Sequence, residues 1–333
     1  MRSDSPPQGY SASLEGAAYY LLPDPGYLWI MGKDRASFLQ RQTTNDTRLL
    51  EPGSALLTVL TDPAARILNV FTLLLEPGSE EAPGEDAAIG VVTLPGLGGQ
   101  AARFLKSRIF FNDQVSLEDK SEEFVQLDLD GPKAAAVLAG LGLEPPGAGQ
   151  VIRLDYEGSS LSVIGPHAFP GPGYRLLGPR SIEEKLIARL HTLGAEPLSP
   201  EAFLARRVEA GLPASGAELR DTFTPLETGL ERAISSTKGC FTGQEVLARQ
   251  ITYDKITQRL SGLRLETAVE PGRRLWAGGK PAGEITSSVF SPRFGWISLA
   301  IVKRPHFEPG ARLYLDQEGA EPAGTVVSLP FDA

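Results

Sequence analysis

The sequence predicts an α+β protein that ends in a small β-barrel, and two observations carry this prediction. Between residues 19 and 255, helical and strand-like patterns alternate without the glycine-rich strand-to-helix turn of a dinucleotide-binding fold. After about residue 256, short strand-like runs separated by turn residues follow one another, as is typical of a small barrel. We therefore expect a flexible tail over residues 1–18, an α+β region of two interleaved subdomains over 19–255, and a barrel over 256–333.

Hydrophobic patterning predicts the elements of the α+β region in order. Strands are expected at 26–32, 56–60, 67–75, 115–117, 124–129, 151–156 and 160–164. Helices are expected at 33–46, with Phe38 and Leu39 facing inward, and at 97–107, 133–139 and 181–193. A capping box of Ser181 and Glu184 opens the last helix and Gly194 closes it. The stretch 76–88 is expected to be an acidic loop between two apolar strands.

Composition excludes several functional classes. The chain has one cysteine and three scattered histidines, so we expect no protein-built metal site and no internal disulfide. A net charge of -9 disfavours a broad phosphate-binding surface, so no direct nucleic-acid contact is expected. No apolar run is long enough to span a membrane, and the N-terminal residues lack the apolar segment of a signal peptide. A cytoplasmic location is therefore the expectation.

The stretch "SPEAFLARRVEAGLP" predicts a helix with Ser199 as its N-cap, Pro200 in its first turn and Gly211 just past its end. Glu209 then lies in the last turn, where the helix dipole disfavours an anion. Two interpretations remain open: Arg206, three residues earlier, offsets the charge, or Glu209 has a functional role.

In "TPLETGL", Thr224, Pro225 and Glu227 fit a capping box, and this structural interpretation explains nearly every residue. In "KGCFTGQEVLARQ", Thr242 and Glu245 fit another capping box, with Phe241 stapled to Val246.

That interpretation leaves the Lys238 and Cys240 positions unexplained. A thiol near a helix N-terminus and a lysine favours the thiolate, which indicates a reactive or ligand-facing cysteine rather than a packing one.

The segments "RVEAGLP", "TPLETGL" and "KGCFTGQEVLAR", in this order and spacing, resemble the YgfZ folate-binding branch of the aminomethyltransferase superfamily. Weaker similarities in "GKDRASFLQRQTTND" and "GEITSSVFSP" extend the resemblance over nearly the whole chain. The resemblance implies aminomethyltransferase-like folate-binding domains followed by a barrel. It further implies tetrahydrofolate as the cofactor, and iron-sulfur client or assembly proteins as partners, with effects on tRNA modification.

The resemblance also implies site residues. Glu209 matches the glutamate that holds folate in T-protein relatives, and Phe203 matches an aromatic position that can stack on the pterin. Lys238 and Cys240 are the candidate catalytic residues beside the reactive edge of the pterin. The further candidate folate-binding residues are Asp46, Glu227, Gln244, Glu245 and Arg249.

Two departures separate this chain from its relatives. Before the strand at 67 the sequence is "PAAR", so only Arg66 remains of a more basic loop. The stretch "VVTLPGLGG" lacks the carboxylate that activates the folate nitrogen in aminomethyltransferases. Ordinary aminomethyl transfer is therefore not expected.

Three functions remain open at the level of sequence. The leading one is a tetrahydrofolate-binding accessory protein for iron-sulfur cluster assembly or repair. The second is a folate-dependent one-carbon transferase, for which Asp46 and Glu227 are the candidate bases. The third is a non-catalytic scaffold that binds client proteins, for which Cys240→Ser would be silent.

Overall fold

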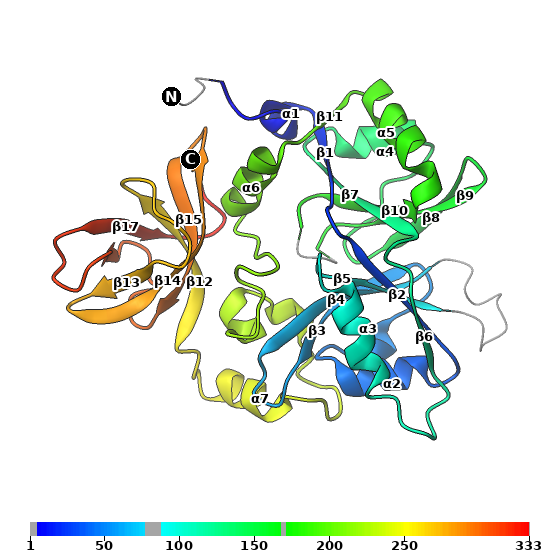
Figure 1. Ribbon diagram of the computed structural model, residues 1–333, viewed down its shortest axis with the longest axis horizontal. Coiled ribbons are helices and arrows are strands. Elements are labelled where there is room, and N and C mark those ends of the chain that lie inside the picture. The colour runs from blue at the N-terminus through cyan, green and yellow to red at the C-terminus, as the bar shows by residue number, and fades with distance from the viewer. Residues whose placement is uncertain (1–4, 77–87, 168–170, 333) are drawn as a thin grey trace.

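The computed structural model describes residues 5–76, 88–167 and 171–332, and it is built from two sheets and a closed barrel (Figure 1). The predicted α+β class with a C-terminal barrel is confirmed. The expected acidic loop lies almost entirely in residues 77–87, outside the described residues. Among the described residues, no helix combines the length and hydrophobicity that crossing a bilayer requires.

The first sheet is antiparallel and has the strand order β3-β4-β5-β2-β6. Its strands are β2 (Gly26–Met31), β3 (Ser54–Thr61), β4 (Ile67–Leu75), β5 (Ile89–Thr93) and β6 (Ser116–Asp119). Helices α2 (Arg35–Gln42) and α3 (Gly98–Lys106) cover one face. Phe38 and Leu39 of α2 are buried there, as predicted. Strand β4 is a near-continuous apolar run because both of its faces are covered.

The second sheet has the strand order β11-β1-β7-β10-β9-β8. Its strands are β1 (Ala17–Leu21), β7 (Phe124–Asp130), β8 (Val151–Tyr156), β9 (Ser159–Ile164), β10 (Tyr174–Pro179) and β11 (Ala195–Pro197). Helices α4 (Ala134–Gly140) and α5 (Glu183–Thr192) supply Val137, Leu138, Leu186 and Leu190 to the core on its outer face. The opposite face of this sheet therefore turns toward the rest of the molecule.

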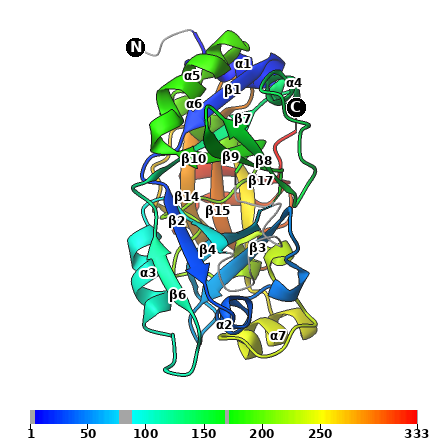
Figure 2. The same ribbon diagram turned by 90° about the vertical axis from the view of Figure 1, so that its right-hand side faces the viewer.

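A separate apolar cluster joins the two sheets. It combines Tyr27, Leu74 and Val92 of the first sheet with Ile164 and Leu177 of the second. Figure 2 shows the sheets one above the other, with the barrel strands behind them. The two sheets therefore pack directly on each other through this cluster.

The barrel closes in the order β12-β15-β14-β13-β16-β17. Its strands are β12 (Gln258–Leu265), β13 (Arg274–Ala277), β14 (Lys280–Ser291), β15 (Gly295–Lys303), β16 (Arg312–Tyr314) and β17 (Pro322–Val327). Helix α6 (Pro200–Glu209) connects the sheets to the barrel, because its Val208 packs with Ile297, Leu299 and Phe331. The remaining helical segments are η1 (Thr47–Leu49), η2 (Arg180–Ile182), η3 (Pro225–Thr228), η4 (Glu231–Ala233) and α7 (Gln244–Thr252).

Two local predictions were wrong. Residues 10–18 are not part of a flexible tail. They form helix α1 (Tyr10–Glu15) and the start of β1, which begins at Ala17. The Tyr10 side chain is buried in a cluster with α6. Ser181 does not cap α5, because the turn η2 already contains it and leads directly into the helix. The chain adopts these arrangements through contacts with distant segments, which local patterning does not report.

Candidate functional site

A central cavity of about 190 Å³ lies where the two sheets meet helix α6. The second sheet contributes Tyr20, Asp128 and Arg175, which lie in register across β1, β7 and β10. The first sheet contributes residues of β4 and β5, namely Val70, Thr72, Val92 and Thr93. Helix α6 contributes Phe203 and Arg207, and the segment 213–215 completes the lining.

One wall of the cavity is aromatic. The rings of Tyr20 and Phe203 stack with centroids 4.0 Å apart and an interplanar angle of 12°. Both side chains are half-buried, so their contact with each other leaves ring surface facing the cavity. Phe203 was among the residues predicted from the sequence. Tyr20 was missed, because its role depends on the pairing of β1 with β7.

Another part of the cavity wall is charged and consists of the ion pair between Asp128 and Arg175. The guanidinium of Arg175 donates to both carboxylate oxygens of Asp128, at 2.7 and 3.0 Å, and the two side chains are 5% and 1% exposed. Burial raises the pKa of Asp128, and the guanidinium of Arg175 opposes this effect. Sequence analysis missed this pair. The available signal was the pattern "LDLD", which puts Asp128 and Asp130 on one face of an apolar strand.

Glu209 does not line this cavity. Its carboxylate is 3% exposed and accepts hydrogen bonds from Tyr10 at 2.5 Å and Ser291 at 2.6 Å. It also pairs with Arg206 at 3.1 Å, so the interpretation in which Arg206 offsets its charge is confirmed. Glu209 thereby ties α1 and the barrel strand β14 to the end of α6. A direct contact between Glu209 and the pterin has no support in this arrangement.

Arg206 extends the same network to the second sheet, because its other terminal nitrogen lies 3.3 Å from Asp130 of β7. Since Phe203 is one helical turn before Arg206, this ion pair fixes the orientation of α6 beside the aromatic wall. The expected N-cap of α6 is also present: Ser199 accepts from the Ala202 amide at 3.2 Å.

Glu227 has a structural position that matches its predicted capping role. Its Oε2 accepts from the Thr224 amide at 2.8 Å, and Arg66 lies 3.4 Å from the same oxygen. Arg66 also donates to the Thr222 carbonyl at 2.8 Å. The "PAAR" loop is therefore anchored to the segment before η3 through this one arginine. Glu227 is 4% exposed and does not line the central cavity.

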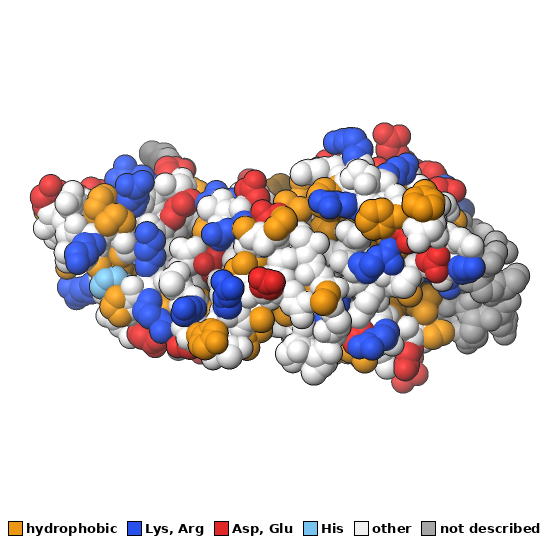
Figure 3. All heavy atoms as spheres, turned by 90° about the horizontal axis from the view of Figure 1, so that it is seen from below, with side chains coloured by type: hydrophobic (Ala, Val, Ile, Leu, Met, Phe, Trp, Pro, Cys, Tyr) orange, Lys and Arg blue, Asp and Glu red, His pale blue; other side chains and the backbone are white. Residues whose placement is uncertain are grey.

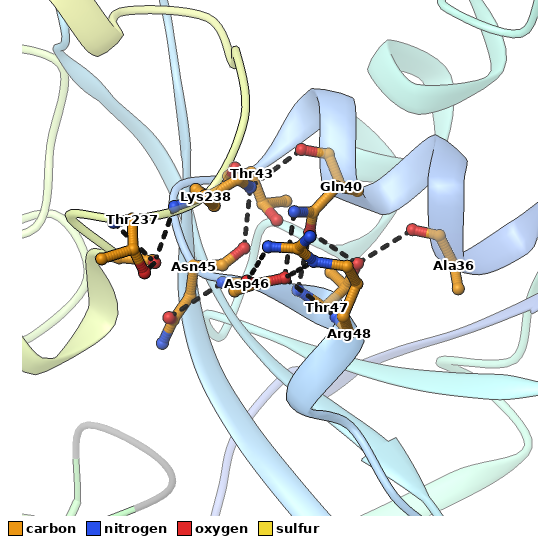
Figure 4. Close-up of polar contacts among 10 residues, drawn as sticks. Ala36, Gln40, Thr43, Asn45, Asp46, Thr47, Arg48, Thr237 and Lys238 are labelled. Carbon is orange, nitrogen blue, oxygen red and sulfur yellow. Dashed lines mark hydrogen bonds and ion pairs between the residues drawn. The ribbon is translucent and has the colours of Figure 1, made fainter.

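Lys238 is buried and its ammonium group lies in a cage of backbone carbonyls (Figure 4). Nζ donates to the carbonyls of Gln40, Thr43 and Asn45 at 2.8, 2.6 and 2.7 Å. An ammonium has three N–H donors, so these contacts use all of them. Burial lowers the pKa of Lys238 to about 8, and the nearby carboxylate of Asp46 opposes this effect. Lys238 therefore anchors its segment to the C-terminal end of α2.

Asp46 belongs to the same region as Lys238. Its carboxylate accepts from both Arg48 and Gln40, and the guanidinium of Arg48 holds its pKa well below the usual range. Figure 4 shows these side chains meeting beside the end of α2. Asp46 does not line the central cavity, so its contacts do not support the predicted folate contact or a role as base.

Cys240 is exposed, and so are Glu245 and Arg249 on α7, while Gln244 is half-buried. None of these residues lines the central cavity. The structure thus separates the predicted site into two groups: Phe203 at the cavity, and the residues of the "KGCFTGQEVLAR" segment about α2 and α7. The expectation that Lys238 and Cys240 face the pterin edge has no support in this geometry.

The Thr242–Glu245 capping box was wrong. The N-cap of α7 is Gly243, with φ +85°, which displaces the helix start by one residue. A Cβ on Gly243 would lie 2.8 Å from the Asp62 carbonyl and 2.9 Å from Ala65 Cα. The second glycine of the motif therefore lets α7 approach the β3–β4 turn closely. Phe241 and Val246 do share one apolar cluster, beside Leu226 and Leu247.

Two domain families match this chain in succession. The GCVT N-terminal domain matches residues 25–238, and the glycine cleavage T-protein C-terminal barrel domain matches residues 258–332. The chain belongs to the glycine cleavage T-protein family. The boundary between the matches falls just before β12, where the barrel of the structure begins.

Several relatives of this chain are named as transferases. A chloroplastic protein of Arabidopsis thaliana, named as a proposed transferase, is 30% identical over 92% of this chain and 69% of its own length. An aminomethyltransferase of Thermus thermophilus is 30% identical over 92% of this chain and 84% of that protein. One from a Nostoc strain is 27% identical over 97% and 86%.

A solved structure confirms the T-protein fold. The crystal structure of the glycine cleavage system aminomethyltransferase T from Bartonella henselae superposes with a TM-score of 0.83. It covers 97% of this chain and 88% of that one, at 22% identity. At this identity the match establishes the fold, and the residues of the cavity must carry any argument about function.

Proposed function

We propose that this protein binds tetrahydrofolate in the central cavity and acts as an accessory factor for iron-sulfur cluster assembly or repair. The proposal places the chain in the YgfZ branch of its superfamily, with iron-sulfur proteins as clients, downstream effects on tRNA modification and a cytoplasmic location. One observation supports the proposed folate binding: a stacked aromatic wall and a buried carboxylate line the same cavity.

The chemistry of the lining fits a pterin. A flat heteroaromatic ring stacks favourably on aromatic faces such as those of Tyr20 and Phe203. The amino and ring N–H donors of a pterin need a carboxylate acceptor, and Asp128 is the carboxylate that lines this cavity among the described residues. In this proposal Asp128 takes the role that the sequence resemblance gave to Glu209, and Glu209 supports the cavity from behind α6.

The accessory role, as opposed to transfer chemistry, draws support from the position of Cys240. The thiol is exposed and lies outside the cavity, so another protein can reach it while the cavity is filled. A cluster-bearing client offers iron atoms that a thiolate can bind. Cys240 in this proposal contacts the client, and Lys238 positions the segment that presents it.

A folate-dependent one-carbon transferase is the second candidate. It is favoured by Asp128, because a carboxylate beside a pterin can act as a general base, and because curated relatives carry aminomethyltransferase names. The two candidates differ in what they require: a transferase needs Asp128 and tolerates Cys240→Ser, whereas the accessory role needs Cys240. A pure scaffold, the third candidate, tolerates both changes.

Calorimetry with 5-formyltetrahydrofolate tests the folate proposal. Phe203→Ala should weaken binding by at least tenfold, because loss of aromatic stacking costs about 0.5–1.5 kcal/mol in addition to the lost area burial. Phe290→Ala is the matched control, since Phe290 is a partly exposed aromatic of the barrel outside this cavity. Equal affinity for wild type and Phe203→Ala would exclude the cavity as the folate site.

The accessory role is tested in cells that lack this protein. Activities of iron-sulfur enzymes should fall and should return with the wild-type chain. They should not return with Cys240→Ser or with Phe203→Ala. If Cys240→Ser restores the iron-sulfur enzyme activities fully and Asp128→Asn does not restore them, the transferase is favoured instead.

A further inference from the structure

A second cavity, of about 440 Å³, lies between the barrel and the segment that leads into η3. Its lining comes from the linker residues Thr222 and Phe223, from the ends of four barrel strands, and from Gly272. The barrel residues that line it are Gln258, Arg274, Pro281, Gly283, Glu284, Ile301 and Lys303. None of them lines the central cavity, so this is a separate site.

The charges at this cavity do not balance. Arg220 pairs with Glu284 at 2.6 Å, which neutralises the carboxylate that lines it. Arg274 and Lys303 have no ion-pair partner within the described parts of the chain, and Arg274 has only a cation–π contact with Trp276, at 5.9 Å. Arg274 lies opposite Glu284 in the β13–β14 pairing, so at this hollow one carboxylate stands against the three cations Arg220, Arg274 and Lys303. This excess occurs in a chain whose net charge is -9, so it is a local feature.

The barrel end of the molecule carries many charged side chains on its lower face. Lys and Arg side chains gather on the barrel end, at the left of Figure 3. Arg274 and Lys303 are both exposed, so water weakens their mutual repulsion without removing it, and both line the same hollow. An anion between them would relieve that repulsion.

The cavity is also built to keep its shape. Phe223 is 3% exposed and supports the guanidinium of Arg220, which lies 5.0 Å from the ring centroid. This contact holds the Arg220–Glu284 pair against the barrel. A Cβ on Gly283 would lie 2.5 Å from the Ile301 carbonyl, so this strand position requires glycine. Thr222 and Gln258 add a hydroxyl and an amide, which can donate to anionic oxygens.

We propose that this cavity binds an anionic group with several oxygens, either a phosphate or a dicarboxylate, through Arg274 and Lys303. A guanidinium and an ammonium together suit such a group, because the planar fork holds two oxygens and the ammonium holds a third. The site is independent of the proposed folate site and of any role for Cys240.

Calorimetry at low ionic strength tests the proposal with two probes, inorganic phosphate and glutarate. The double variant Arg274→Gln/Lys303→Gln should lose at least tenfold in affinity for the anion that binds. The control is Lys280→Gln/Arg312→Gln, which removes two exposed barrel cations that do not line the cavity. It should retain wild-type affinity, because only the charges at the cavity contact the anion.

The two probes also distinguish the sources of the anion. Binding of phosphate alone points to a phosphorylated ligand, and binding of glutarate alone points to a carboxylate-bearing one. No binding of either probe to the wild type overturns the proposal. An equal loss of affinity in the control variant also overturns it, because binding would then follow net charge alone.

Discussion

The guanidinium of Arg175 donates to both carboxylate oxygens of Asp128, and this buried pair forms part of the wall of the central cavity. The pair lies beside Tyr20, in register across three strands of the second sheet. Its position makes the same two side chains important for stability and for the proposed pterin contact.

Removing one partner of this pair should destabilise the fold. Asp128→Ala should lower the free energy of unfolding by about 3–5 kcal/mol, because Arg175 is then left buried without its counter-charge. Urea denaturation measures the change. Glu157→Ala is the control, since the Lys185–Glu157 pair is exposed and such pairs contribute about 0–1 kcal/mol. A loss for Asp128→Ala no larger than the control would show that Arg175 finds compensation elsewhere.

The two glycines of "KGCFTG" should respond differently to substitution. Gly243→Ala should lower the free energy of unfolding by about 1–3 kcal/mol, because φ is +85° and the added Cβ meets the β3–β4 turn. Gly239→Ala should change it by less than about 0.5 kcal/mol, since no heavy atom lies within 4 Å of the added carbon. Urea denaturation of both variants checks this pair, and similar losses would contradict the assignment.

Lys238 should make stability depend on pH. Burial lowers its folded-state pKa to about 8, below the unfolded value of about 10.4, so the unfolded chain binds more protons between these pH values. The contribution of Lys238 to the free energy of unfolding should therefore rise as pH increases from about 8 to about 10.4. The rise should be at most about 1.4 kcal/mol for each pH unit.

The measurement is the difference in unfolding free energy between wild type and Lys238→Met across this pH range. Exposed Lys185→Met, which lacks the burial, should show no such trend. If the difference for Lys238→Met falls or stays flat as pH rises, the ammonium is stabilised by its carbonyl cage more than burial destabilises it.

Cys240 should react with iodoacetamide in the native protein at the same rate with and without 5-formyltetrahydrofolate. The thiol is exposed and does not line the central cavity, so a pterin bound there cannot cover it. Mass spectrometry follows the labelling. Protection of Cys240 by the folate would place the ligand beside the "KGCFTG" segment. Lys238 and Cys240 would then lie beside the reactive edge of the pterin, as the sequence predicted.

The sequence predicted those parts of the fold that depend on local patterning. The helix that buries Phe38 and Leu39, the strand 67–75, the N-cap Ser199 and the barrel all follow from periodicity and turn residues. Tyr10 was placed in a flexible tail because its contact with Glu209 spans 199 residues of sequence. Contacts at that separation leave no periodic signal.

The candidate site was predicted only in part, for a related reason. Phe203 is found at the cavity, but Tyr20, Asp128 and Arg175 come together through strand pairing that the sequence does not specify. Glu209 and Lys238 were correctly recognised as unusual charges within their segments. The structure shows that buried partners satisfy them: Tyr10, Ser291 and Arg206 for the carboxylate, and backbone carbonyls for the ammonium.

A crystal structure of this protein with 5-formyltetrahydrofolate bound is the decisive test of the folate site in the central cavity. We expect electron density for the pterin in the central cavity, with the ring against Phe203 and its N–H donors facing the Asp128 carboxylate. Glu209 should keep its contacts with Tyr10 and Ser291 in that complex. A pterin bound to Glu209 after those contacts break, or one bound beside Lys238 and Cys240, would rule out the proposed folate site.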